Sequence, residues 1–228
     1  LAFDPSEQPV FAQIFGKNED TFIRATQVCE DMGFSGIDIN MGCPAKRVVK
    51  SEHGIALRKK PDQACRLVEA VATTTSLPVS VKTRLGWSNA DGLITFVKRL
   101  ENAGANMICI HARTYQNPYN VPAQLEHLYE LKQHMTVPLI INGGILSMQD
   151  GLSKVKHCDG FYIGQASFGN PWVFSLQGEP ATFREKLPVI YKHCEWLIED
   201  KGEFVGTREI RKHLLQYVKG FPGAKQYR

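Results

Sequence analysis

Six short apolar runs recur along the sequence, and each of them ends in polar residues or glycine. The runs span residues 9–16, 36–44, 78–86, 107–113, 138–144 and 160–166. Patterns of helical period separate successive runs, and the first of these is carried by Phe22, Ala25, Val28 and Met32. Strands of this length that alternate with helices predict βαβ units and a parallel sheet.

The polar residues gather at the points where the predicted strands end. They are Gln13, Asn40 to Cys43, Lys82 to Arg84, His111 to Arg113, Asn142 to Gly144, and Gly164 with Gln165. Polar residues at one end of every strand are typical of (β/α) barrels, which keep their active sites on that face. The first loop lacks a G-x-G-x-x-G motif, which argues against a doubly wound dinucleotide fold. We predict an α/β fold of the TIM (β/α)8-barrel type, in which this chain contains about six strands.

The strand pattern stops after Pro171 and Trp172, and residues 183–201 and 207–219 predict helices. We therefore expect two domains: a catalytic barrel over residues 1–180, incomplete at its N-terminus, and a helical domain over residues 181–228, incomplete at its C-terminus.

The charge is uneven between these two parts. The chain has a net charge of +4, and residues 208–228 contain six Lys or Arg against one Asp or Glu. On a helix, Arg208, Arg211 and Lys212 share much of one face, and Leu214, Leu215 and Val218 would pack on the opposite face. A basic appendage on a near-neutral body favours binding of a polyanion such as a nucleic acid, the alternative being a merely solvated face.

Composition excludes several other classes of protein. No run of 18 apolar residues predicts a membrane-spanning helix, and the N-terminal residues lack the features of a signal peptide. The first residue is Leu1, so we expect a processed or incomplete N-terminus. The six cysteines are scattered without a C-x-x-C pair. We expect reduced thiols, no metal site and a cytoplasmic location.

Cys43 is the residue on which the functional prediction depends. Ile37 and Ile39 alternate with polar residues in a buried-strand pattern, and a Met-Gly turn then leads to Cys43 and Pro44. A cysteine is often only a core residue. Asn40, three residues earlier, favours function because its amide can hydrogen-bond a planar heterocycle that the thiol reaches.

Two glycine loops follow the last two strands, Asn142-Gly143-Gly144 and Gly164-Gln165. Glycines let backbone N–H groups approach phosphate oxygens, although they also simply form turns. Lys82 and His111 end the strands between. Such a lysine can stabilise negative charge on a reduced flavin or on a phosphate, whereas a single histidine is more often structural.

The sequence resembles the dihydrouridine synthase family, flavin enzymes that reduce uridines in tRNA. The resemblance rests on FAQIFG, DINMGCPAKRVV, PVSVKTRLGW, IHART, NGGI and IGQASFGNPW, in the family's order from Gln8 to Trp172. The tail, Arg211 to Arg228, is similar to the family's C-terminal helical domain. The chain differs at Gln165, where the family usually has Arg. It also lacks the family's first two strands, and its helical domain stops early.

The resemblance implies a role for each site residue. Cys43 would be the general acid that protonates C5 of uracil, while reduced FMN delivers hydride to C6 and NAD(P)H is the reductant. Lys82, His111 and Gln13 match residues around the flavin, and Asn40, Arg84 and Arg113 match the substrate side. The phosphate of FMN would be held by Asn142, Gly143, Gly144, Gly164 and Gln165.

Two other functions remain open at this stage. A dihydroorotate-dehydrogenase-like FMN oxidoreductase would share the barrel and the pyrimidine chemistry, but it would not need a basic helical tail. An RNA-binding protein that has lost its flavin is the alternative of another class. In either case we expect a monomer that contacts neither membrane nor metal.

Overall fold

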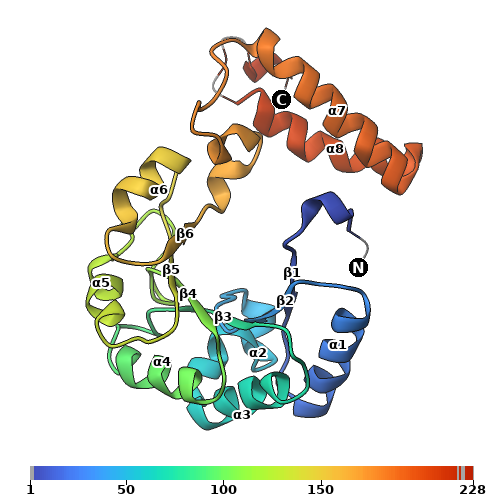
Figure 1. Cartoon of the computed structure of the whole chain (residues 1–228). Helices are drawn as coiled ribbons and strands as arrows, with labels where there is room; N and C mark the ends of the chain where they lie inside the picture. Colours follow the sequence, from blue (N-terminus) through green and yellow to red (C-terminus); the bar gives the residue numbers. More distant parts are fainter. Residues whose placement is uncertain (1–2, 220, 222–223, 228) are drawn as a thin grey trace. The chain divides into compact units, whose positions relative to one another are not determined.

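The computed structural model describes residues 3–219, 221 and 224–227 (Figure 1). The chain divides into two compact units. Unit 1 comprises residues 1–144 and 155–162, and unit 2 comprises residues 145–154 and 163–228. The second unit thus begins earlier in the chain than the boundary after residue 180 expected from the sequence. Residues 220, 222–223 and 228 of the predicted basic tail lie outside the described residues.

Unit 1 is built on one parallel sheet whose strand order follows the sequence, β1-β2-β3-β4-β5-β6. The strands are β1 (Phe11–Ile14), β2 (Gly36–Asn40), β3 (Val79–Arg84), β4 (Met107–His111), β5 (Leu139–Asn142) and β6 (Gly160–Tyr162). Each strand coincides with one of the six apolar runs. This arrangement of parallel strands and helices confirms the predicted α/β, TIM-barrel-like fold.

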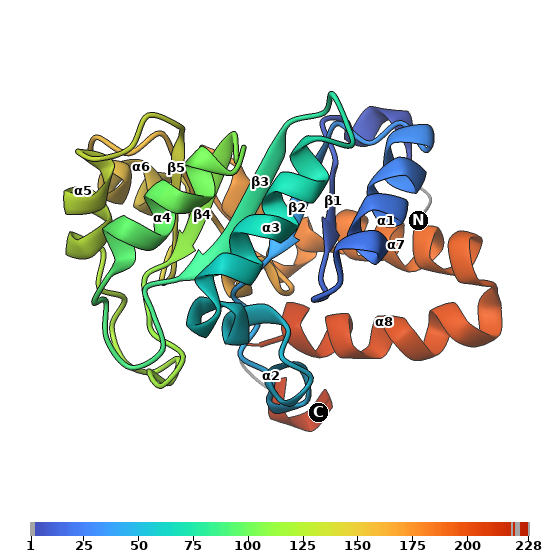
Figure 2. The same cartoon turned by 90° about the horizontal axis from the view of Figure 1, so that it is seen from below.

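Helices connect the strands and cover the outer face of the sheet (Figure 2). In unit 1 they are α1 (Glu19–Asp31), α2 (Lys46–Lys50), α3 (Pro61–Ala72), α4 (Leu93–Asn102) and α5 (Glu126–Lys132). Asn18 caps α1, since its side chain accepts a hydrogen bond from the N–H of Thr21. The short helix α2 and the 3₁₀ segment η2 (Gly54–Lys59) were not predicted from the sequence.

The two faces of the sheet differ in polarity. On the outer face, aliphatic side chains such as Ile39, Val81, Ile108 and Leu139 are fully buried against the helices. Burial of each contributes about 1.5–3 kcal/mol. The inner face instead carries polar residues at alternate positions. In register across the sheet, Asn40 lies beside Lys82, and Arg84, His111, Asn142 and Tyr162 form one row. The core therefore lies on one side of the sheet and the polar strand ends on the other.

Unit 2 contains α6 (Met148–Val155, its last residue in unit 1) and two longer helices that pack on each other, α7 (Phe183–Lys201) and α8 (Glu203–Tyr217). The predicted start of α8 at Thr207 was wrong because Gly206 lies inside the helix. A Cβ at Gly206 would lie 2.6 Å from the Leu197 carbonyl oxygen, so the glycine permits close approach of α7 rather than breaking α8. The predicted apolar face also needs correction, since Ile210 and Tyr217 are buried whereas Leu215 is 40% exposed.

Candidate active site at the strand ends

The turn that presents Cys43 is held by the side chain of Asn40. The amide oxygen of Asn40 accepts hydrogen bonds from the N–H groups of Gly42, at 3.1 Å, and Cys43, at 3.0 Å. An asparagine commonly stabilises a turn in this way by bonding to backbone groups that follow it. The residue that ends β2 thus fixes the backbone of the cysteine, whose side chain is half-buried.

The same turn is fastened to the neighbouring strand β3. The N–H of Met41 donates to the Lys82 carbonyl at 2.8 Å, and Nε of Arg84 donates to the Gly42 carbonyl at 2.9 Å. A side chain at Gly42 would come within 3.2–3.3 Å of the backbone of Lys82 and Thr83. Position 42 therefore has little room for a Cβ, and the thiol is carried by a rigid strand end.

Asp38, which the sequence analysis did not select, links the first three strands. Its carboxylate accepts from Nε2 of Gln13 at 2.6 Å and from the hydroxyl of Ser80 at 2.6 Å. The Oε1 atom of Gln13 in turn accepts from Nδ2 of Asn40 at 2.9 Å. This chain of hydrogen bonds sets the orientation of both amides. The predicted residues Gln13 and Asn40 are thereby brought together.

Lys82 and Asn142 meet on the polar face. Nζ of Lys82 donates to Oδ1 of Asn142 at 3.1 Å and lies 5.3 Å from the centre of the Tyr162 ring. Nδ2 of Asn142 donates to the Tyr162 carbonyl at 3.0 Å. Among the described residues Lys82 takes part in no ion pair with a carboxylate. Its positive charge therefore remains available for a negatively charged group.

His111 is held as a neutral imidazole at the end of β4. Its Nε2 lies 3.0 Å from Nη1 of Arg113, and a guanidinium only donates, so Nε2 accepts and the ring proton is on Nδ1. Burial, together with the positive charges of Arg84, Lys82 and Arg113, lowers the pKa of His111 to about 3. His111 can therefore offer an N–H from Nδ1 to a ligand at neutral pH.

The two predicted arginines are buried and organise the loop that follows β4. Arg84 is 3% exposed and donates through Nη1 to the Thr114 carbonyl at 3.2 Å. Arg113 is 7% exposed and donates through Nε to the Val121 carbonyl at 2.6 Å. No ion pair in the described part of the chain joins either guanidinium to a carboxylate. Against the single carboxylate of Asp38, Lys82 and the two arginines leave the polar face with an excess of positive charge, which favours an anionic ligand.

Tyr119 is a second residue that the sequence analysis missed. It lies on the loop after β4, and its hydroxyl accepts from Nη2 of Arg84 at 3.3 Å. Its ring centre lies 5.8 Å from the His111 ring, yet the residue is 53% exposed. The local sequence around Tyr119 does not predict its hydrogen bond to Arg84, because the two residues are 35 positions apart in the chain.

The glycine loops differ in their surroundings. Gly143 has φ +116°, and a Cβ there would lie 2.9 Å from Cδ2 of His111, so no side chain fits beside the imidazole. Gly164 and Gln165 belong to unit 2, where a Cβ on Gly164 would meet no atom within 4 Å and Gln165 is exposed. The structure therefore gathers Asn142 and Gly143 with the site in unit 1. Gly144, which follows them in the same unit, has φ +67°.

The predicted tail residues lie on α8 in unit 2. Arg208, Arg211 and Lys212 are all exposed. The guanidinium of Arg208 also lies 3.8 Å from the centre of the Phe204 ring. Their exposure leaves these side chains accessible, and their role in binding remains a prediction.

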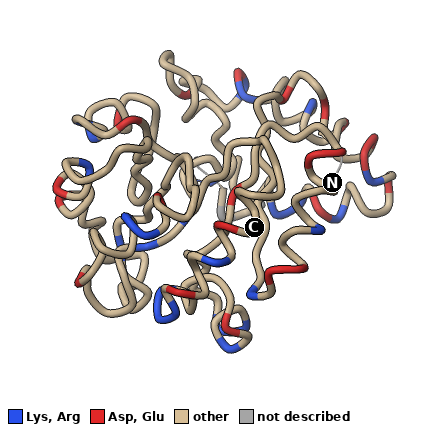
Figure 3. Tube along the Cα trace, turned by 60° about the horizontal axis from the view of Figure 1, so that its bottom comes forward, with Lys and Arg blue, Asp and Glu red and all other residues tan. Residues whose placement is uncertain are grey.

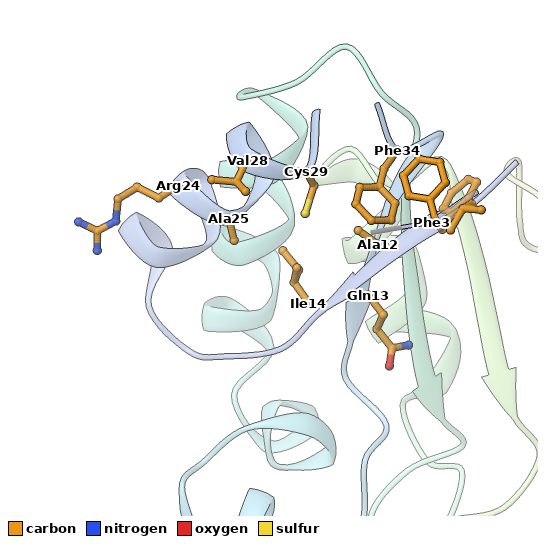
Figure 4. A pocket seen from close by; sticks show the side chains of 11 residues that line it. Phe3, Ala12, Gln13, Ile14, Arg24, Ala25, Val28, Cys29 and Phe34 are labelled. Atoms are coloured by element: carbon orange, nitrogen blue, oxygen red, sulfur yellow. The ribbon is translucent and has the colours of Figure 1, made fainter. Parts of the chain in front are cut away.

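A cavity of about 550 Å³ lies beside β1 and α1, and Gln13 of the candidate site is among the residues that line it (Figure 4). Apolar side chains, including Ile14, Val28, Cys29 and Phe34, make up most of its lining. Across the described residues, no group of three or more His, Cys, Asp or Glu could hold a metal ion. Within the same residues, no helix has the length and hydropathy to span a membrane.

Comparison with known proteins identifies relatives of this chain. The family model described as "Dihydrouridine synthase (Dus)" matches residues 1–228. The chain is 35% identical to "Probable tRNA-dihydrouridine synthase 1" of Synechocystis sp. over 240 residues, which covers 100% of the chain and 67% of that protein. It is 32% identical to "Probable tRNA-dihydrouridine synthase" of Rickettsia prowazekii, over 99% of the chain and 72% of that protein. It is 29% identical to "tRNA-dihydrouridine(20/20a) synthase" of Xanthomonas axonopodis pv. citri, over 100% of the chain and 73% of that protein. The chain belongs to the dihydrouridine synthase family.

Proposed function

We propose that this protein reduces the C5=C6 bond of uridines in tRNA to dihydrouridine, with FMN as cofactor and NAD(P)H as reductant. The observation that carries the proposal is the placement of Cys43 on a fixed turn beside a cationic, hydrogen-bonding row of strand ends. The relatives' names, which specify tRNA, support the choice of substrate.

The residues of the polar face fit a flavin mononucleotide. Gln13, Lys82, His111 and Asn142 offer the amide, ammonium and imidazole groups that the polar edge of an isoalloxazine requires. Gly143 presents bare backbone beside His111, where no side chain fits. Within the described residues, Lys82, Arg84 and Arg113 take part in no ion pair with a carboxylate, which suits a ligand that carries negative charge. Asn142, Gly143 and Gly144 of unit 1 would contact the phosphate, and a phosphate contact at Gly164 and Gln165 stays a prediction from the sequence.

Bound FMN would supply a hydride for C6 of the uracil, after reduction by NAD(P)H. The protein's own chemical contribution is the proton for C5, which the Cys43 thiol donates as general acid. Asn40 keeps the backbone of Cys43 in place through its two hydrogen bonds. Lys82 and the Nδ1–H of His111 stabilise negative charge and orient the polar atoms of the ligand. A base paired in tRNA must leave its stack to reach these groups.

Incubation of the purified protein with FMN, NADPH and an unmodified tRNA transcript tests the proposal. Dihydrouridine should form in the transcript, detected by mass spectrometry of its nucleosides. A protein that binds no flavin and forms no dihydrouridine, but still binds the transcript, would be an RNA-binding protein and not the proposed enzyme.

A further inference from the structure

The positive charge of unit 1 is concentrated in the segment that follows Cys43. Residues 46–60 contain six Lys or Arg and a single carboxylate, Glu52. Figure 3 shows how cations and carboxylates are distributed along the trace. Glu52 is already shared between Lys17 and Lys60, with which it forms ion pairs. The other cations of this segment form no ion pair with any carboxylate in the described part of the chain.

Three of these cations lie on the short helix α2, and we name them the α2 cluster: Lys46, Arg47 and Lys50. All three are exposed, and none takes part in an ion pair among the described residues. Their spacing, i to i+4 and i to i+3, places them close together on one side of the helix. Like charges at this spacing destabilise a helix. The repulsion among these three charges therefore destabilises α2, and a bound anion would relieve it.

The α2 cluster is attached to the catalytic turn. Lys46 follows Cys43 by three residues, which limits the separation of their Cα atoms to about 11 Å. After α2 in the chain, the N–H of Ile55 in η2 donates to the Cys43 carbonyl at 3.2 Å. A Cβ on Gly54 would lie 2.7 Å from that carbonyl oxygen and 3.0 Å from Cγ1 of Val48. The helix, η2 and the thiol thus form one packed substructure.

Aromatic side chains of the loops after β3 and β4 lie beside this substructure. Nζ of Lys59 lies 3.3 Å from the centre of the Trp87 ring, and Trp87 lies 4.2 Å from Tyr115. Both rings are half-buried. Cations combined with aromatic rings are the chemistry with which proteins hold nucleic acid, through phosphates and stacked bases.

We infer that the α2 cluster binds the phosphate backbone of RNA next to the nucleotide whose base reaches Cys43. This inference rests on the proposed function and adds a second RNA-binding surface, on unit 1, to the one predicted on α8. Phosphate contacts set the register of a protein on its nucleic acid without reading sequence. Because α2 begins three residues after Cys43 and the following segment η2 is bonded to the Cys43 carbonyl, a phosphate held by the cluster limits the distance between the RNA strand and the thiol.

The test compares two triple variants of the full chain that lose the same charge. Lys46→Ala/Arg47→Ala/Lys50→Ala removes the α2 cluster, and Arg24→Ala/Arg66→Ala/Lys98→Ala removes three cations from α1, α3 and α4 on the outer face. Affinity for an unmodified tRNA transcript is measured by fluorescence anisotropy over a range of KCl concentrations. Equal melting temperatures establish that both variants are folded.

The inference predicts that loss of the α2 cluster weakens binding about 10-fold or more and lowers the slope of log affinity against log salt by about 2 to 3. The control variant should bind within about two-fold of the wild type. In addition, bound tRNA should slow acetylation of Lys46 and Lys50 in the wild type but not of Lys98. Equal binding by both variants, with no effect of tRNA on the acetylation of Lys46 and Lys50, would overturn the inference. Dihydrouridine formation by the wild type would in that case still support the proposed function. A wild type that does not bind the transcript would overturn both.

Discussion

Nη1 of Arg113 lies 3.0 Å from Nε2 of His111, and the contact fixes the protonation of the histidine. The guanidinium can only donate, so the imidazole is neutral and carries its proton on Nδ1. Without this contact either ring nitrogen could carry the proton, and His111 could face a ligand as acceptor. Arg113 is therefore a positioning residue for His111 as well as an anchor of the loop after β4.

The first prediction concerns stability and pH. The pKa of His111 is lowered to about 3, mainly by burial, whereas an unfolded histidine has a pKa of about 6.5. Between these two pKa values the unfolded chain binds more protons than the folded chain, so the free energy of unfolding falls as the pH falls below 6.5. Above pH 6.5, His111 makes no pH-dependent contribution to that free energy. The free energy of unfolding of the wild type should fall between pH 7 and pH 5 through His111. In His111→Gln this fall should be smaller by up to about 2 kcal/mol.

Urea unfolding of the wild type and His111→Gln at several pH values provides the measurement. His127→Gln is the matched control, because His127 is exposed on α5. If the stability of His111→Gln depends on pH as steeply as that of the control, His111 is not held neutral by the fold.

The second prediction concerns the phosphate of FMN. Gly164→Val adds a side chain where a Cβ meets no atom of the protein within 4 Å, so the fold should tolerate it. If the backbone at Gly164 holds a phosphate, the valine occupies the phosphate's place and the protein should purify with little flavin. Visible absorbance gives the flavin content, and the melting temperature checks folding. A Gly164→Val protein that keeps its full flavin content would place the phosphate elsewhere.

Gly143→Val is a less informative variant. The positive φ of Gly143 and its closeness to His111 predict destabilisation even without a ligand. Loss of flavin from this variant would therefore not separate a phosphate contact from a distorted strand end.

The third prediction concerns α8. Arg208→Ala/Arg211→Ala/Lys212→Ala should weaken binding of all tRNAs alike and reduce the salt slope by up to about 0.9 per lost contact. Arg208 packs on Phe204, so part of its effect can be structural, and Arg211→Ala/Lys212→Ala should retain most of the change. Anisotropy titrations with several tRNA transcripts measure both quantities. An unaltered salt slope would mean that α8 presents only a solvated basic face.

The strands were predictable because each is a short apolar run followed by turn or polar residues. The buried aliphatic positions, such as Ile39 and Ile108, confirm the pattern that carried the prediction. The helix α2 was not predictable in this way. It has only five residues, and its two valines are adjacent, so no helical period develops.

The site residues contributed by distant segments were harder to find. Asp38 precedes Asn40 by two residues in the same strand, so the alternation of the strand places both on one face. That shared face was the signal by which Asp38 could have been found. Tyr119 gave none, because its contacts with Arg84 and His111 depend on the path of a loop. The start of α8 was misjudged since glycine usually ends a helix, whereas here Gly206 serves helix packing.

The central claim is that Cys43 donates the proton to C5 of uracil. Cys43→Ala should retain bound flavin and melting temperature, because the turn is held by backbone contacts and by Asn40 and not by the thiol. Its rate of dihydrouridine formation in a single turnover with saturating tRNA should fall by about 100-fold or more, as expected for a lost general acid. Cys65→Ala, a half-buried cysteine on α3, is the matched control and should react like the wild type. A wild-type rate in Cys43→Ala would contradict the account.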